Sequence, residues 1–228
     1  MKTNKKLFTR TITFSPLVRF FHWIRAFCIF FLIFSGFYLA YPFLIPEVSA
    51  TPTNFLYASF RSFHVIAGFL LIAVSFFRVY LFFTSKSKGE RVSAKDLFDT
   101  KVWIGQIKNY LFLGAHPHIK GVYNPIQFFA YLVFAILILI ISLSGVILYY
   151  HVYHDGLGGI LAYMFKWLEV AVGGLANVRI IHHIATWTII LFIPVHVYMV
   201  VWNAVKHPDG GADSIVGGYR YQEAHLKE

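Results

Sequence analysis

The chain has 228 residues, of which 58% are hydrophobic and only 13% are charged, and this balance excludes an ordinary soluble domain with a polar surface. The formal charge of +10 at pH 7 does not indicate a nucleic-acid partner, because the basic residues flank apolar runs instead of forming a patch beside stacking aromatic side chains. The single cysteine, Cys28, excludes a disulfide framework and a CxxC redox or zinc site, so any redox chemistry requires a non-thiol cofactor.

Four apolar stretches reach the length of about 20 residues that a helix needs to cross a membrane. They cover residues 17–40, 57–83, 125–150 and 180–203. A shorter apolar segment, 157–172, carries Lys166 and Glu169 and is bounded by glycine pairs, which indicates an amphipathic helix at the membrane interface. The sequence therefore predicts an all-α integral membrane protein. Its single domain, 1–228, is a bundle of four transmembrane helices with a short interfacial helix between the third and the fourth.

Lysine and arginine residues predict the orientation of the four helices. They precede the first helix and fill the connection 84–124, whereas the connection 41–54 contains neither residue type. Because cytoplasmic loops carry an excess of Lys and Arg, the two basic segments are expected in the cytoplasm, together with both termini.

Five histidines lie inside the expected spans, where an ionisable side chain is costly and is a functional candidate by default. They are His22 on the first helix, His64 on the second, and His182, His183 and His196 on the fourth. His182 and His196 are 14 residues apart, which returns them to nearly one helix face, about 21 Å apart along the axis. His183 faces largely the other way, so we prefer His182 as a ligand and keep His183 as the alternative.

The expected depth of each histidine in the membrane groups four of them into two pairs. His64 and His182 are expected near the outer face, and His22 and His196 near the inner face. Each pair suits the iron of a haem b, held by two neutral imidazole nitrogens. Two axial histidines leave no open iron position, which favours electron transfer over oxygen chemistry. Another bis-histidine metal site, a proton relay or plain helix-to-helix hydrogen bonds are the alternatives.

Three further residues are candidates to contact the two haems. The spacing of 14 residues that separates His182 from His196 also separates His22 from Gly36 and His64 from Arg78. Gly36 would let the outer porphyrin approach the first helix, and plain helix packing is its alternative role. Arg78, level with the inner haem, and Arg61, near the outer one, are candidates to pair with propionates, with snorkelling to the interface as the alternative.

Several stretches of the sequence together resemble one known family. They are Arg19 to Trp23 in the first helix, Arg61 to His64 in the second, Asn124-Pro125 before the third, Ile181 to His183 and His196 to Tyr198 in the fourth, and Ser214 to Arg220 near the end. Over nearly its whole length the chain resembles the b-type cytochrome subunit of membrane-bound nickel-iron hydrogenases. In that family His22, His64, His182 and His196 match the haem positions.

The resemblance implies a dihaem anchor in the bacterial cytoplasmic (inner) membrane. Such a subunit takes electrons from the iron-sulfur small subunit of an outward-facing hydrogenase, which also has a large subunit, and passes them through the outer and then the inner haem to menaquinone or ubiquinone. It does not itself activate hydrogen. A higher-order oligomer of the complex is compatible with this arrangement. Because the family's quinone is thought to sit near the inner haem, His118 and Asn124 are candidate quinone contacts.

Three alternatives remain at this stage. The cytochrome b subunit of a formate dehydrogenase has a similar number of spans and a similar placement of histidines, although the stretch from Ser214 to Arg220 favours hydrogenase. A stand-alone transmembrane electron carrier would need no catalytic partner. A transporter or haem-free anchor would tolerate the loss of all four paired histidines.

Overall fold

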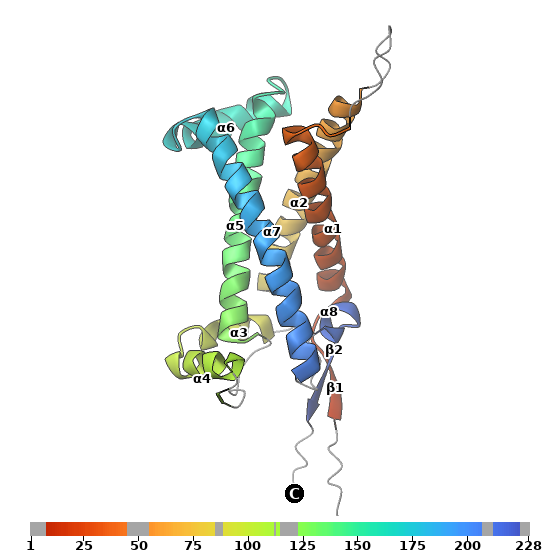
Figure 1. Cartoon of the computed structure of the whole chain (residues 1–228), viewed down its shortest axis with the longest axis vertical. Coiled ribbons are helices and arrows are strands. Elements are labelled where there is room, and N and C mark those ends of the chain that lie inside the picture. Colours follow the sequence, from red (N-terminus) through yellow and green to blue (C-terminus); the bar gives the residue numbers. More distant parts are fainter. Residues whose placement is uncertain are drawn as a thin grey trace, which may run out of the picture. The chain divides into compact units, whose positions relative to one another are not determined.

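The computed structural model describes residues 8–44, 55–84, 89–111, 113–114, 123–206 and 212–223 (Figure 1). The elements found within these residues are, in chain order, β1 (Phe8–Ile12), α1 (Pro16–Ala40), α2 (Leu56–Thr84), α3 (Gly89–Asp96), α4 (Thr100–Tyr110), α5 (Pro125–Tyr150), α6 (Leu157–Ala171), α7 (Leu175–Lys206), α8 (Asp213–Val216) and β2 (Tyr219–Glu223).

Four of the helices, α1, α2, α5 and α7, are long and apolar enough to cross a membrane. Large hydrophobic side chains face outward along them, including Phe27 and Phe76, each 72% exposed, and Leu191, 68% exposed. In water such exposure would be unfavourable, whereas lipid tails are a suitable solvent for it, and a helix satisfies its backbone hydrogen bonds internally. The expected multi-pass membrane protein with a helical bundle is confirmed. The orientation and the positions of the termini stay predictions.

The chain forms two compact units, which we describe separately. Unit 1 comprises residues 1–22, 78–133 and 192–228, and unit 2 comprises residues 23–77 and 134–191. Each of the four long helices contributes residues to both units. The histidines divide accordingly, because His22 and His196 belong to unit 1 whereas His64 and His182 belong to unit 2. The expected single membrane domain stays a prediction.

Unit 1 contains a small sheet that the sequence analysis did not predict. Strands β1 and β2 pair antiparallel, with Phe8 opposite Glu223 and Ile12 opposite Tyr219 (Figure 1). The guanidinium of Arg10 lies 3.4 Å from the centroid of the Tyr219 ring. An isolated two-stranded sheet has only marginal stability in water. Here the two strands come from opposite ends of the chain, so their pairing is a long-range contact that a local sequence pattern does not predict.

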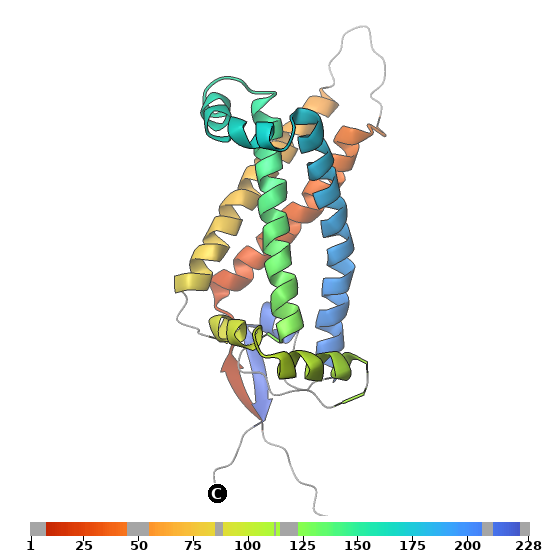
Figure 2. The same cartoon turned by 90° about the vertical axis from the view of Figure 1, so that its left-hand side faces the viewer.

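Unit 1 also contains two short helices, α3 and α4, in the basic connection where no helix was expected. Asp99 caps α4 by accepting a hydrogen bond from the Lys101 backbone N–H at 3.1 Å. The Trp103 indole donates to the Leu97 carbonyl at 2.9 Å, which holds the two helices together. Figure 2 shows α4 lying crosswise to the first turns of α5. The sequence analysis described this connection only by its basic residues and its expected cytoplasmic side, so both helices are additions from the structure.

In unit 2, the segment expected to form a short amphipathic helix is α6, which lies crosswise to α5 (Figure 2). One face packs Leu161, Phe165 and Leu168 against a buried cluster that includes Ile147 and Tyr150. The turn from α6 into α7 needs glycine, because Gly173 and Gly174 have φ angles of 87° and 94°. The location of α6 at the membrane interface stays a prediction.

Candidate functional site

Unit 2 brings together His64, on α2, and His182, on α7. Both residues belong to this unit, on helices that are far apart in the sequence. Both side chains are partly buried, whereas the neighbouring His183 is exposed. His182 is thus the less exposed of the two adjacent histidines on α7, and the choice of His182 over His183 as a ligand stays a prediction. The ligand role itself stays a prediction.

Each of these two histidines has a serine partner on another helix. Ser35 Oγ, on α1, lies 2.8 Å from His64 Nδ1, and Ser144 Oγ, on α5, lies 2.9 Å from His182 Nδ1. Both serines are buried, with 0% and 5% of their surface exposed. Both of these contacts are made by Nδ1 of the imidazole. A metal-bound histidine usually has a hydrogen-bond partner on its other ring nitrogen, and these serines occupy that place, which the sequence did not identify.

Unit 1 brings together His22, on α1, and His196, on α7. Their ring centroids are 6.5 Å apart and their planes are inclined at 49°. Phe192 stacks on the His196 ring at 5.6 Å and 12°, and Tyr131 approaches its edge at 5.8 Å. Two aromatic side chains therefore flank the His196 ring, as suits a site for a flat apolar cofactor.

The spacing of the unit 1 pair fits two histidines on one metal ion. A histidine nitrogen binds a first-row metal at about 2 Å, and the ring centroid lies roughly 1 Å beyond it, so two opposed rings on one ion would be about 6 Å apart. The observed 6.5 Å agrees with this separation. His22 and His196 would therefore be able to hold a haem b between them.

The other candidate haem contacts have these surroundings. The Cβ of a side chain added at Gly36 would lie 3.4 Å from His64 Cε1, so this glycine lies against the imidazole. The Arg61 guanidinium lies 5.9 Å from the Tyr57 ring centroid, and its Nε is buried without a hydrogen-bond partner. Arg78 belongs to unit 1, as do His22 and His196. Pairing of either arginine with a propionate stays a prediction.

Of the two candidate quinone contacts, His118 lies outside the described residues, and Asn124 has a local structural role. Asn124 Oδ1 accepts from the Gln127 backbone N–H at 2.8 Å, and Gln127 Oε1 accepts from the Asn124 backbone N–H at 3.3 Å. This reciprocal pair is a capping box at the start of α5, followed by Pro125 at the first helical position. Asn124 Nδ2 also donates to the Tyr110 hydroxyl at 2.9 Å, which ties α4 to α5.

These contacts predict that Asn124→Ala destabilises the protein by about 1 kcal/mol, the usual cost of a lost N-cap. Asn124→Ser keeps a capping oxygen and should recover most of the loss. Thermal unfolding of the detergent-solubilised protein measures both changes. If capping is the main role, the serine variant also keeps normal quinone reduction. A serine variant that is stable yet fails to reduce quinone would instead assign Asn124 to the quinone site.

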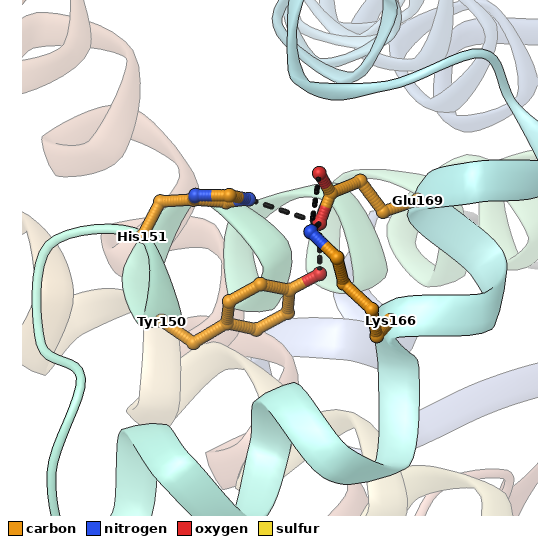
Figure 3. Close-up of polar contacts among 4 residues, drawn as sticks. All are labelled: Tyr150, His151, Lys166 and Glu169. Atoms are coloured by element: carbon orange, nitrogen blue, oxygen red, sulfur yellow. Dashed lines mark hydrogen bonds and ion pairs between the residues drawn. The ribbon is translucent and has the colours of Figure 1, made fainter.

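A buried carboxylate that the sequence analysis missed lies between α5 and α6 in unit 2 (Figure 3). Glu169, 6% exposed, accepts hydrogen bonds from the Tyr150 hydroxyl at 2.6 Å, from His151 Nε2 at 2.9 Å, and from Lys166 Nζ at 2.9 and 3.0 Å. The hydrogen bond from Tyr150 lowers the pKa of Glu169 most, followed by those from Lys166 and His151. Burial opposes them, and the pKa is lowered to about 2.

A signal for this cluster was present in the sequence. Lys166 and Glu169 are three residues apart, so they are neighbours on one helical turn within an otherwise apolar segment. The contact with His151 was not foreseeable, because it joins residues on either side of a loop.

Comparisons with known proteins identify the family of the chain and several of its relatives. The model of a family described as "Prokaryotic cytochrome b561" matches residues 13–218. Among curated proteins, the chain is 24% identical to a probable Ni/Fe-hydrogenase B-type cytochrome subunit of Rhodobacter capsulatus, covering 93% of this chain and 82% of that one. The protein of the same name from Rhizobium leguminosarum bv. viciae is 28% identical, covering 89% and 85%. The probable Ni/Fe-hydrogenase 1 B-type cytochrome subunit of Escherichia coli K12 is 25% identical, covering 91% and 89%.

Proposed function

This chain belongs to the prokaryotic cytochrome b561 family, and from that premise we propose that it is the dihaem b-type cytochrome subunit that connects a nickel-iron hydrogenase to membrane quinone. The observation that carries the proposal is the grouping of four histidines: His22 lies beside His196 in unit 1, and unit 2 contains His64 and His182, each hydrogen-bonded to a buried serine. The names of the related proteins support hydrogenase as the partner.

In this proposal, each histidine pair holds one haem b through its ring nitrogens. When bound, the two haems supply one-electron carriers between the faces of the membrane. The polypeptide holds the imidazoles in place: helices α2 and α7 carry the unit 2 pair, and α1 and α7 carry the unit 1 pair. The lipid-facing side chains exclude water from the spans, and the arginines Arg61 and Arg78 are candidate propionate partners.

The hydrogenase small subunit, with its iron-sulfur clusters, is the proposed electron donor, and the large subunit is the site of hydrogen activation. Menaquinone or ubiquinone is the proposed acceptor, near the unit 1 pair. His118 and Asn124 stay candidate contacts to it, although both ends of the Asn124 amide are already engaged within the protein.

The test uses the complex purified from native membranes. Haem is counted per chain as the pyridine haemochromogen, and the oxidised complex is then given hydrogen while its absorption is followed. Two b haems per chain, reduced by hydrogen and reoxidised by added quinone, are the expected result. Reduction by formate but not by hydrogen would keep the haem sites and replace the donor. A chain that purifies without haem would overturn the proposal.

A further inference from the structure

Two serine-glycine pairs contact the histidines of unit 2 in the same way. On α1, Ser35 Oγ lies 2.8 Å from His64 Nδ1, and a Cβ added at Gly36 would lie 3.4 Å from His64 Cε1. On α5, Ser144 Oγ lies 2.9 Å from His182 Nδ1, and a Cβ added at Gly145 would lie 3.5 Å from His182 Cε1. The two helices therefore present the same dipeptide to the same edge of the two rings.

Hydrogen-bond counting favours one direction for both contacts. A serine hydroxyl has one proton and two lone pairs. Ser35 Oγ donates to the Phe31 carbonyl at 2.8 Å, and Ser144 Oγ donates to the Ile141 carbonyl at 3.0 Å. A carbonyl cannot donate, so each hydroxyl proton is used on the serine's own helix. Each Oγ consequently accepts from an imidazole, and the proton of that imidazole is on Nδ1.

The protonated Nδ1 leaves Nε2 of His64 and of His182 with a free lone pair. This is the tautomer that a neutral histidine needs to bind a metal ion through Nε2. The glycine beside each serine contributes through its missing side chain. It lets the imidazole edge lie against the helix, and a Cβ at either position would meet the ring at ordinary van der Waals distance.

We propose that Ser35 and Ser144 are positioning residues that fix the tautomer and orientation of the two histidine ligands of a single haem b. This inference rests on the proposed function. It assigns both serine–histidine hydrogen bonds to the haem proposed for unit 2, and none to the other haem. An acceptor on Nδ1–H increases the basicity of Nε2, which favours the ferric over the ferrous state. Loss of the acceptor should therefore raise the midpoint potential of that haem.

The variants Ser35→Ala and Ser144→Ala test the proposal in the full complex. Ser142→Ala is the matched control, because it removes a hydroxyl from the same helix as Ser144 but about 200° around the axis. Ser35→Thr and Ser144→Thr keep a hydroxyl. Folded protein is compared by size-exclusion chromatography, haem is counted per chain, and optical redox titration with ferric-haem electron paramagnetic resonance follows each haem separately.

We expect each alanine variant to shift the potential of one haem to more positive values and to change the g values of that haem alone. The double alanine variant should shift it further, and the threonine and Ser142→Ala variants should resemble the unaltered protein. Loss of that single haem from a folded alanine variant, with recovery in the threonine variant, supports the same role.

Two outcomes overturn the inference, and they are distinguishable from failure of the proposed function. In the first, both haems are present and their potentials and g values are unchanged in both alanine variants. In the second, the threonine variants behave like the alanine variants, which would show that packing volume, not the hydroxyl, matters. Absence of haem from the unaltered protein would instead refute the proposed function and remove the basis of this inference.

Discussion

Replacement of His182 by alanine is expected to remove one of the two haems proposed for the chain and to abolish hydrogen-dependent quinone reduction. Even the loss of a hydrogen-bond partner to a ligating histidine lowers metal affinity by about 10- to 100-fold, so the loss of the ligand itself should cost more. His64→Ala should remove the same haem, because both residues belong to the unit 2 pair. His22→Ala and His196→Ala should each remove the other one. Haem per folded chain and the redox difference spectrum measure these losses.

The matched control is His183→Ala, which changes the next residue of the same helix. His183 is exposed, whereas His182 contacts Ser144. The control variant should retain both haems and normal quinone reduction. If His182→Ala keeps both haems while His183→Ala loses one, the ligand is His183 and the helical-phase argument is wrong.

Replacement of Glu169 by alanine is expected to destabilise the protein by about 2 kcal/mol, the cost of leaving a buried hydrogen-bonding group without its partner. Most of this lost stability comes from Tyr150, which is 4% exposed and whose hydroxyl donates a hydrogen bond to the carboxylate at 2.6 Å. Lys166 contributes less, because its side chain is 56% exposed and its ion pair is screened by water. Thermal unfolding in detergent should show a clear decrease for Glu169→Ala and a small one for Lys166→Ala.

The same carboxylate predicts a pH dependence in the acid range. The pKa of Glu169 is lowered from 4.5 to about 2, chiefly by the hydrogen bond from Tyr150. A carboxyl group with a lower pKa in the folded state stabilises that state above its unfolded pKa, and the stabilisation is lost as the pH falls from about 4.5 towards 2. Glu169→Gln removes this titration, so its stability should decline less over that range. Parallel stability curves for the unaltered protein and the Glu169→Gln variant would contradict the assignment.

Local sequence information was sufficient for the membrane helices. A span needs only a run of about 20 apolar residues, and this is a property of contiguous sequence. The 14-residue step between His182 and His196 is likewise local, because helix geometry alone converts it into a common face. The expected depth of each histidine in the membrane then predicted which of them would be neighbours. The structure places His22 beside His196. Their function as haem ligands stays a prediction.

The sequence by itself determined the four membrane helices and the positions of the histidines along them, because apolar length and helical period are set by residues close in the chain. The tertiary structure alone decided the partners of those residues. Ser35 meets His64 across 29 positions, Ser144 meets His182 across 38, and β1 pairs with β2 from the other end of the chain. Such contacts depend on which helix faces pack together. Many apolar faces in a bundle are similar in composition, so the pattern of one segment does not specify its neighbour.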